Sequence, residues 1–441
     1  MAQLIPKYLG IVRRKTNAQL LAWQGFNLIK YSSVIITAII MARLIPDLEV
    51  IKSYENILLL ASTFSFFFVS GLGQTVIPYY ETQDIKEKES IFKTLFYLLF
   101  TLGTISSLFL AIYGLCFSTN NASNYLLFAL ITLLNIPSFA LENNYLVHKK
   151  HLSLFSWGLL TYLIQIPVFL IPLLLFNSLQ AGFVGLLGIA LLKFLFTCYR
   201  LKIFNSLNDV KKQIIPFLTY SWPVLISFIV GGSYVYLNAI IVEQNLSSKD
   251  FVLYRYGARE FPLFLIIANS FSLVYSAKIA KGLKANNPTL ALKAFKLKSK
   301  KVMHQLFPLA IFLMLSSQVL FDLFYSQAYT NAYMVFNIML FLLASRLLFP
   351  QTILFGYGIT RQFLYASSIE LITGITLSLT LVNYYGLIGV SIAMVIAFLI
   401  EKIYLIFICY KHKINFFNHV PTGIYLLYLS LLTGSFFLSI L

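Results

Sequence analysis

Thirteen apolar stretches, each long enough to cross a lipid bilayer, occupy almost the whole length of this chain. A helix needs about 20 consecutive apolar residues to span a membrane. The chain is 59% hydrophobic and only 11% charged, whereas a soluble domain carries about 25% charged residues. The pattern predicts an all-α polytopic membrane protein with about 13 transmembrane helices, within a range of about 12 to 14. The expected spans are 20–42, 56–80, 91–117, 123–147, 152–176, 182–200, 216–242, 251–277, 304–323, 331–354, 362–382, 387–410 and 421–440.

Basic residues fall in every second gap between these stretches. Of the 33 lysines and arginines, 24 lie in segments on one side of the membrane, 3 on the other and 6 inside spans. The positive-inside rule therefore predicts a cytoplasmic amino terminus. The same rule and the attraction of anionic lipids account for the net charge of +18, so we expect membrane lipids and no nucleic acid as partners.

The spans divide into two sets of six on either side of the inner loop at 201–215. Similar sequences open the last span of each set, Gly-Phe-Val-Gly at 182–185 and Gly-Leu-Ile-Gly at 386–389. This similarity predicts a parallel internal repeat, an architecture found in transporters whose two lobes rock about a central site. The expected parts are a six-helix lobe over 1–203, a second over 204–414 and an extra transmembrane helix over 415–441.

The gaps between spans leave no room for a catalytic domain. No outer loop exceeds roughly a dozen residues, and no phosphate-binding G-x-x-x-x-G-K-[ST] motif occurs. The three cysteines have no spacing that suggests a disulfide or a metal site. We therefore expect a protein that is not an enzyme and that has no catalytic residues, no bound metal and no cofactor.

Charged residues inside spans are costly, by about 2.5–3.5 kcal/mol each at a helix centre, and are kept where they face protein or water. Lys30, Arg255, Arg259 and Arg346 are predicted to form the positive wall of a cavity for an anionic head group. Arg255 and Arg259 are four residues apart, which would place them on one helix face. The alternative is that such side chains snorkel toward the membrane surface, which is our interpretation of Lys193.

Polar and acidic residues complete the set of candidates. Gln24 and Asn27 lie within two helical turns of Lys30 and are predicted to contact sugars. The carboxylates Glu142, Glu260 and Glu370 either bind a coupling H⁺ or Na⁺ or simply neutralise a nearby cation, and the sequence leaves both alternatives open.

Four motifs, each on a particular span, carry a family resemblance: Met-Ala-Arg-Leu-Ile-Pro at 41–46, Ser-Gly-Leu-Gly at 70–73, Tyr-Arg-Tyr-Gly-Ala-Arg at 254–259 and Tyr-Gly-Leu-Ile-Gly-Val-Ser-Ile-Ala at 385–393. Together the chain resembles the polysaccharide-biosynthesis membrane proteins, the O-antigen and capsule repeat-unit flippases of the multidrug/oligosaccharidyl-lipid/polysaccharide (MOP) superfamily. The resemblance implies two six-helix lobes around a central cavity, like the multidrug transporters of that superfamily. Members usually have 12 or 14 spans, so the last helix departs from the pattern.

The resemblance also implies a function. An undecaprenyl-pyrophosphate-linked oligosaccharide would pass from the inner to the outer leaflet of the bacterial cytoplasmic membrane by alternating access, for O-antigen (lipopolysaccharide), capsule or exopolysaccharide assembly. A polysaccharide polymerase and chain-length proteins are the implied protein partners, and an H⁺ or Na⁺ gradient is a candidate driving force. Two alternatives stay open, a multidrug/ion antiporter of the same superfamily and, with less support, a membrane polysaccharide polymerase.

Overall fold

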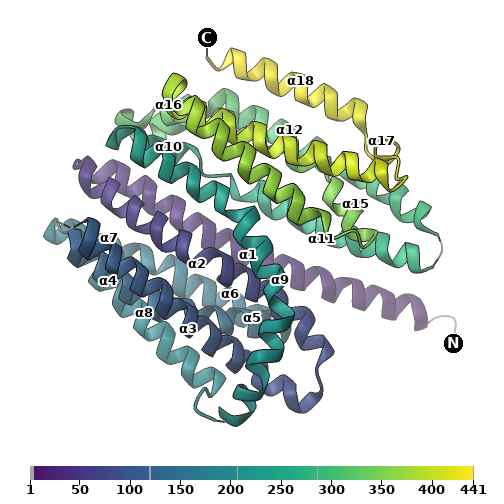
Figure 1. Cartoon of the computed structure of the whole chain (residues 1–441), viewed down its shortest axis with the longest axis horizontal. Helices are drawn as coiled ribbons and strands as arrows, with labels where there is room; N and C mark the ends of the chain where they lie inside the picture. The colour runs from purple at the N-terminus through teal and green to yellow at the C-terminus, as the bar shows by residue number, and fades with distance from the viewer. Residues whose placement is uncertain (1–3, 119–120, 206, 286, 441) are drawn as a thin grey trace. The chain divides into compact units, whose positions relative to one another are not determined.

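Every regular element in the described part of the chain is a helix. The computed structural model describes residues 4–118, 121–205, 207–285 and 287–440 (Figure 1). Within these residues, 11 helices are long and apolar enough to cross a membrane. One of them, α16 (Gln362–Lys411), is two helices joined at a sharp kink, and a shorter apolar helix, α18 (Thr422–Leu438), follows. The prediction of an all-helical, multi-pass membrane protein is confirmed.

The chain divides into two compact units, Met1–Thr37 with Ser53–Ile229 and Ala38–Lys52 with Val230–Leu441. Three helices contribute residues to both units, α1 (Leu4–Leu44), α2 (Leu48–Thr82) and α9 (Leu207–Asn245). The division falls within α9, and α18 is part of the second unit.

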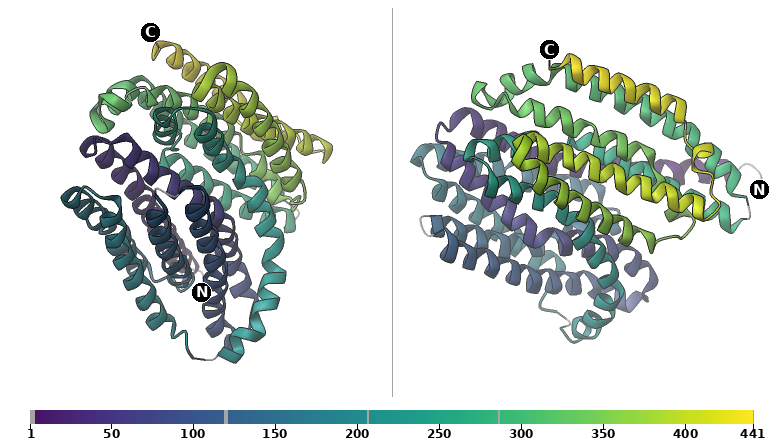
Figure 2. Two further views of the ribbon diagram at one scale, coloured as in Figure 1. Left: turned by 60° about the vertical axis from the view of Figure 1, so that its left-hand side comes forward. Right: turned by 45° about the horizontal axis from the view of Figure 1, so that its top comes forward.

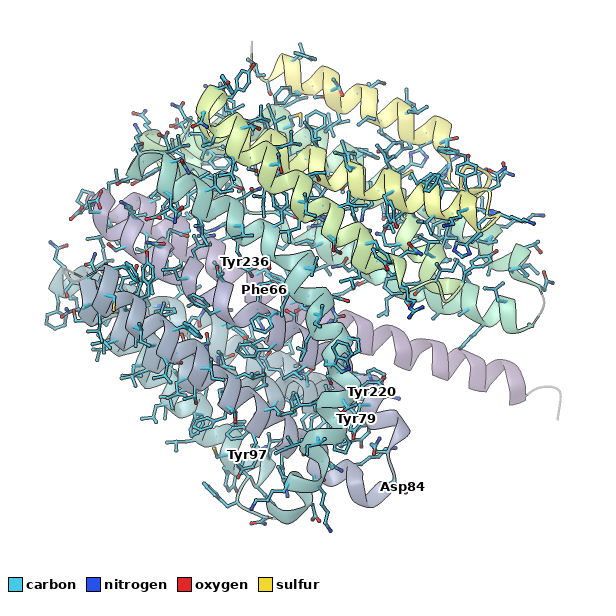
Figure 3. The ribbon with its side chains drawn as sticks, viewed as in Figure 1. Phe66, Tyr79, Asp84, Tyr97, Tyr220 and Tyr236 are labelled. Atoms are coloured by element: carbon cyan, nitrogen blue, oxygen red, sulfur yellow. The ribbon has the colours of Figure 1, made fainter. Side chains whose placement is uncertain are left out.

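The first unit is built from α3 to α8, with parts of α1, α2 and α9. Here α3 packs on α4, and α8 packs on both α4 and α7. Tyr79 of α2 and Tyr220 of α9 lie side by side, with ring centroids 5.3 Å apart (Figure 3). The bounds are α2 (Leu48–Thr82), α3 (Ile85–Phe117), α4 (Ala122–Asn135), η2 (Ile136–Ser138), α5 (Phe139–Val147), α6 (His151–Gly158), η3 (Leu159–Leu163), α7 (Gln165–Phe176) and α8 (Leu179–Leu201).

A glycine sets how closely α8 approaches α7. A Cβ atom on Gly185 would lie 2.2 Å from the backbone oxygen of Val168, whereas a Cβ on Gly188, one turn further along α8, would meet nothing within 4 Å. A backbone oxygen cannot move aside as a flexible side chain can. Small residues that allow such close approach are typical of helix contacts in membranes.

We expect Gly185→Ala to destabilise the protein by about 1–3 kcal/mol, the usual cost of overpacking. Gly188→Ala is the matched control, because the same methyl group is added to the same helix in open space. Thermal unfolding of both variants in detergent measures the difference. Equal unfolding temperatures for the two variants would contradict this account of the α7–α8 contact.

The second unit packs around α12. Helix α11 lies on α12 and α15, and α18 lies along α12 (Figure 2). Tyr425 of α18 donates a hydrogen bond to the Ala344 oxygen, which ties the last helix to this unit. The bounds are α10 (Ser248–Gly257), α11 (Pro262–Lys284), α12 (Pro288–Tyr325), η4 (Gln327–Tyr329), α13 (Ala332–Leu340), α14 (Leu342–Leu348), α15 (Pro350–Gly356) and α17 (Phe416–His419).

The kink in α16 separates the predicted eleventh and twelfth spans. Gly386 has φ 56° and ψ −136°, a backbone conformation that is open essentially to glycine. Beyond the bend, a Cβ on Gly389 would lie 2.3 Å from the Leu381 oxygen. The close approach of Gly185 to the preceding span therefore recurs here, at the equivalent glycine of the other Gly-x-x-Gly sequence.

Candidate functional site

Lys30, Glu142 and Tyr162 come together inside the first unit. The Lys30 Nζ atom lies 3.4 Å from Glu142 Oε2, and the Tyr162 hydroxyl donates a 2.7 Å hydrogen bond to Glu142 Oε1. The ammonium group also lies over the Phe139 ring, 4.0 Å from its centroid. Glu142 is 3% exposed, so its carboxylate depends on these partners rather than on solvent. Of the two alternatives for Glu142, the structure shows the neutralising contact.

Glu142 and Tyr162 both lie next to or within an interruption of a helix. Pro137 lies in the 3₁₀ turn η2, just before Glu142 on α5, and Tyr162 lies in the π-helical turn η3. A proline has no backbone N–H to donate to the oxygen of the residue four positions earlier. Pro167 therefore cannot make this hydrogen bond to Leu163, the last residue of η3. Turns of the π type are frequent at functional sites. The 3₁₀ and π turns therefore interrupt the helices next to Glu142 and Tyr162.

Lys193 of α8 joins the same cluster. Its ammonium group donates a short hydrogen bond to Asn135 Oδ1 and lies 5.0 Å from the centroid of the Tyr162 ring. Glu142 and Lys30 both act on it electrostatically. Lys193 is 4% exposed, so our interpretation of this residue as a snorkelling side chain is wrong. The cluster therefore holds two ammonium groups and one carboxylate, and we refer to Lys30, Glu142, Tyr162 and Lys193 as the lysine cluster.

The two predicted sugar contacts, Gln24 and Asn27, lie on α1 ahead of Lys30. Asn27 Nδ2 donates to the Trp23 oxygen on its own helix, at 3.0 Å. Gln24 is half-buried on the same helix. Their assignment to sugar binding stays a prediction.

In the second unit, the predicted eighth span is broken at its two arginines. Helix α10 ends at Gly257 and α11 begins at Pro262, so Arg255 lies in the last turn of α10 and Arg259 in the connection. The prediction that Arg255 and Arg259 share one face of a continuous helix is wrong. The physical reason is Pro262, which forces the preceding residue, Phe261, into an extended conformation with ψ 119°.

The break between α10 and α11 places Glu260 beside a charged residue of another helix. Arg346 of α14 donates a 2.6 Å hydrogen bond to Glu260 Oε1, and both side chains are mostly buried. Arg259 lies against Tyr256, with its guanidinium carbon 5.5 Å from the ring centroid. A small pocket joins these groups, and its lining consists of the three charged residues and apolar side chains, namely Arg259, Glu260, Arg346, Phe261, Phe264, Phe336, Met339, Leu340, Leu342 and Leu343.

Glu370 lies apart from this pocket on α16 and is 4% exposed. Its electrostatic neighbours are Glu401, Lys402 and Arg346. Glu401 and Lys402 form a tight ion pair of 2.6 Å. In the described part of the chain, no group of three or more histidine, cysteine, aspartate or glutamate side chains is placed to hold a metal ion.

Solved transporter structures match this fold over nearly their whole length. The lipid II flippase MurJ in an inward closed conformation gives a TM-score of 0.65 at 18% sequence identity, over 97% of this chain and 91% of that chain. The eukaryotic MATE transporter AtDTX14 gives 0.63 at 15% identity, over 90% and 96%. A MOP superfamily transporter from Pyrococcus furiosus gives 0.60 at 13% identity, over 91% and 96%.

The chain has the MOP-superfamily fold. No family model matches its sequence, and no curated protein matches it. At these sequence identities the likeness establishes the fold of the chain alone. The expected MOP-like architecture is confirmed, whereas the narrower resemblance to polysaccharide flippases stays a prediction.

The sequence identified the charged residues inside the spans, but it did not predict the partners that they contact. Lys193 looked like an isolated cation near a span end, and only the packing of α8 on α4 places it beside Tyr162 and Asn135. Tyr162 was one of 28 tyrosines and carried no signal of its own. The nearest sequence signal was Pro167, which marks the irregular turn that holds Tyr162.

Proposed function

We propose that this protein transfers lipid-linked oligosaccharide units, carried on a polyprenyl pyrophosphate, from the inner to the outer leaflet of a bacterial cytoplasmic membrane. The observation that supports it best is the lysine cluster, where the buried ammonium group of Lys193 and the partly buried one of Lys30 share one carboxylate. A net positive charge at membrane depth is costly without an anion, and a pyrophosphate is a compact anion with many acceptor oxygens.

The second unit offers arginines for the same kind of ligand. Arg259 lies at a small pocket beside the Arg346–Glu260 pair, and arginine binds phosphate oxygens through two parallel hydrogen bonds. In our proposal each unit supplies its own cations, Lys30 and Lys193 in the first and Arg255, Arg259 and Arg346 in the second. Alternating access then exposes the head group on one side of the membrane and later on the other, with the amino terminus in the cytoplasm.

The fold likeness supports this proposal at the level of ligand class. MurJ is described as a lipid II flippase, so the MOP fold accommodates lipid-linked precursors. Multidrug resistance MATE transporters share the fold as well, which makes drug export the second candidate. The cationic excess of the lysine cluster opposes it, because a cationic drug would be repelled there.

The decisive experiment measures lipid-linked oligosaccharide in each leaflet of a strain that lacks the gene. We expect single units to accumulate on the cytoplasmic face and the wild-type gene to clear them. Units that reach the outer face without this protein would contradict the proposal. Single units displayed at the cell surface would indicate a polymerase, and drug sensitivity with normal glycan would indicate an exporter.

A further inference from the structure

The joined ends of α11 and α12 form a strongly basic hairpin at one end of the second unit. Eight lysines lie between residues 278 and 301, and the chain carries no aspartate or glutamate between Glu260 and Asp322. In Figure 1 and in the right-hand view of Figure 2, this hairpin reaches further than α17. No carboxylate of α11 or of the start of α12 therefore neutralises the lysines. We refer to residues 278–285 and 287–301 as the basic hairpin.

One face of the start of α12 is packed into the second unit. Leu292 and Phe295 are buried. The Phe295 ring lies against Phe271 of α11, with ring centroids 5.5 Å apart. Lys296 Nζ donates a 3.1 Å hydrogen bond to the backbone oxygen of Asn418 on α17. These contacts hold the first turns of α12 as a fixed surface of the second unit.

The opposite face of the same turns has no such cover. Leu290 and Leu297 are 70% and 68% exposed. They are seven residues apart, which places them on the same side of the helix and two turns from each other. Lys293 and Lys300 are also exposed and repeat at the same interval. The outward face of α12 therefore alternates apolar and cationic side chains.

The lipid bilayer does not reach this outward face. Gln305 is the last exposed polar residue of α12 before exposed apolar side chains that begin with Pro308 and Phe312, so the hydrocarbon layer begins near Pro308. At 1.5 Å per residue, Leu297 and Leu290 lie about 16 and 27 Å along the helix from Pro308. The headgroup layer is only about 5–8 Å thick on each side, and a helix tilt of about 40° would not bring the leucines into it.

A partner of this face has to match both kinds of side chain. An amphipathic helix with an apolar residue and a glutamate or aspartate at the same seven-residue spacing does so. Helices with that repeat pack side by side, and their flanking charges select the partner. A nucleic acid would supply negative charge alone and leave Leu290 and Leu297 in water. Charge complementarity and the exposed leucines together favour an acidic helix.

We propose that the basic hairpin is a docking surface for an acidic amphipathic helix of another protein, on the side of the membrane predicted to be cytoplasmic. Leu290 and Leu297 pack into the apolar stripe of that helix, and Lys293 and Lys300 pair with its carboxylates. The described lining of the small pocket at Arg259 includes no residue of the basic hairpin. The docking surface is therefore separate from the proposed transport and does not depend on it.

Fluorescence anisotropy of a labelled synthetic peptide tests this surface on the full-length protein in phosphatidylcholine nanodiscs. The peptide repeats leucine and glutamate at seven-residue intervals, and a shuffled peptide of the same composition is the reference. We expect Leu290→Gln with Leu297→Gln to weaken binding of the peptide at least about tenfold, because two apolar contacts are lost while every charge is kept. Leu152→Gln is the matched control and should bind the peptide as the wild type does, since Leu152 is 81% exposed beside Lys149 and Lys150.

Three results would overturn the proposal. Equal affinity of the double variant and the wild type, or equal affinity for the two peptides, would show attraction by charge alone. Quenching of the fluorescence that Leu290→Trp adds, in phosphatidylglycerol vesicles with brominated acyl chains, would place this face on lipid, and we expect no such quenching. Because Leu290 and Leu297 are exposed, the variants should unfold at the same temperature as the wild type, which thermal unfolding checks.

Discussion

Lys30→Ala is expected to abolish delivery of lipid-linked oligosaccharide to the outer leaflet. Loss of one partner from a buried, hydrogen-bonded charge contact costs about 2–5 kcal/mol, or more than about tenfold in affinity. The same change also strands Glu142, which is 3% exposed and would keep only the Tyr162 hydrogen bond. A loss of activity in this variant alone therefore has two explanations, a lost substrate contact and a damaged cluster.

A second variant separates these explanations. Lys30→Ala combined with Glu142→Gln removes the stranded charge while the amide oxygen can still accept from Tyr162. We expect the double variant to be well folded and inactive in the leaflet assay, and Lys30→Arg to retain activity. Recovery of transport in the double variant would mean that Lys30 serves only to neutralise Glu142, and the lysine cluster would no longer support a pyrophosphate site.

The Arg346–Glu260 pair should give the largest effect on stability. Removal of one partner from a buried ion pair costs about 3–5 kcal/mol because the other charge is left uncompensated. Both side chains are mostly buried, 21% and 18% exposed, and their atoms approach to 2.6 Å. We expect Arg346→Met and Glu260→Leu each to lower the unfolding temperature markedly in detergent.

The double variant provides the control for this prediction. Arg346→Met with Glu260→Leu removes both members of the pair, and replacement of a whole buried pair by apolar residues is often neutral or stabilising. We therefore expect it to unfold at a higher temperature than either single variant. Additive losses in the three variants would show that the pair makes no specific contribution.

The fold was predictable because membrane insertion depends on local quantities. Apolar length and the side on which lysine and arginine accumulate are both read directly along the chain, and they predicted the all-helical, multi-pass architecture. The weak point was the eighth span, predicted as one helix over 251–277, which is broken between Gly257 and Pro262. A proline signals an interruption, but its neighbours decide whether the helix bends or stops.

The partners of the buried charges could not be predicted in the same way. Lys30 meets Glu142 across 112 residues of sequence, and Arg346 meets Glu260 across 86. Such pairs depend on how helices pack, which hydropathy does not encode. From the sequence, Glu142, Glu260 and Glu370 were equivalent candidates, and only their surroundings distinguish two paired carboxylates from one with an unpaired oxygen.

The bend at Gly386 has a consequence for the insertion of the chain into the membrane during synthesis. With a single non-helical residue between its two limbs, α16 has almost no polar segment that could rest at the membrane surface between them. We therefore expect the two limbs to enter the membrane together, as a helical hairpin. Substitution of Gly386 would then reduce the yield of inserted protein before any transport step could be affected.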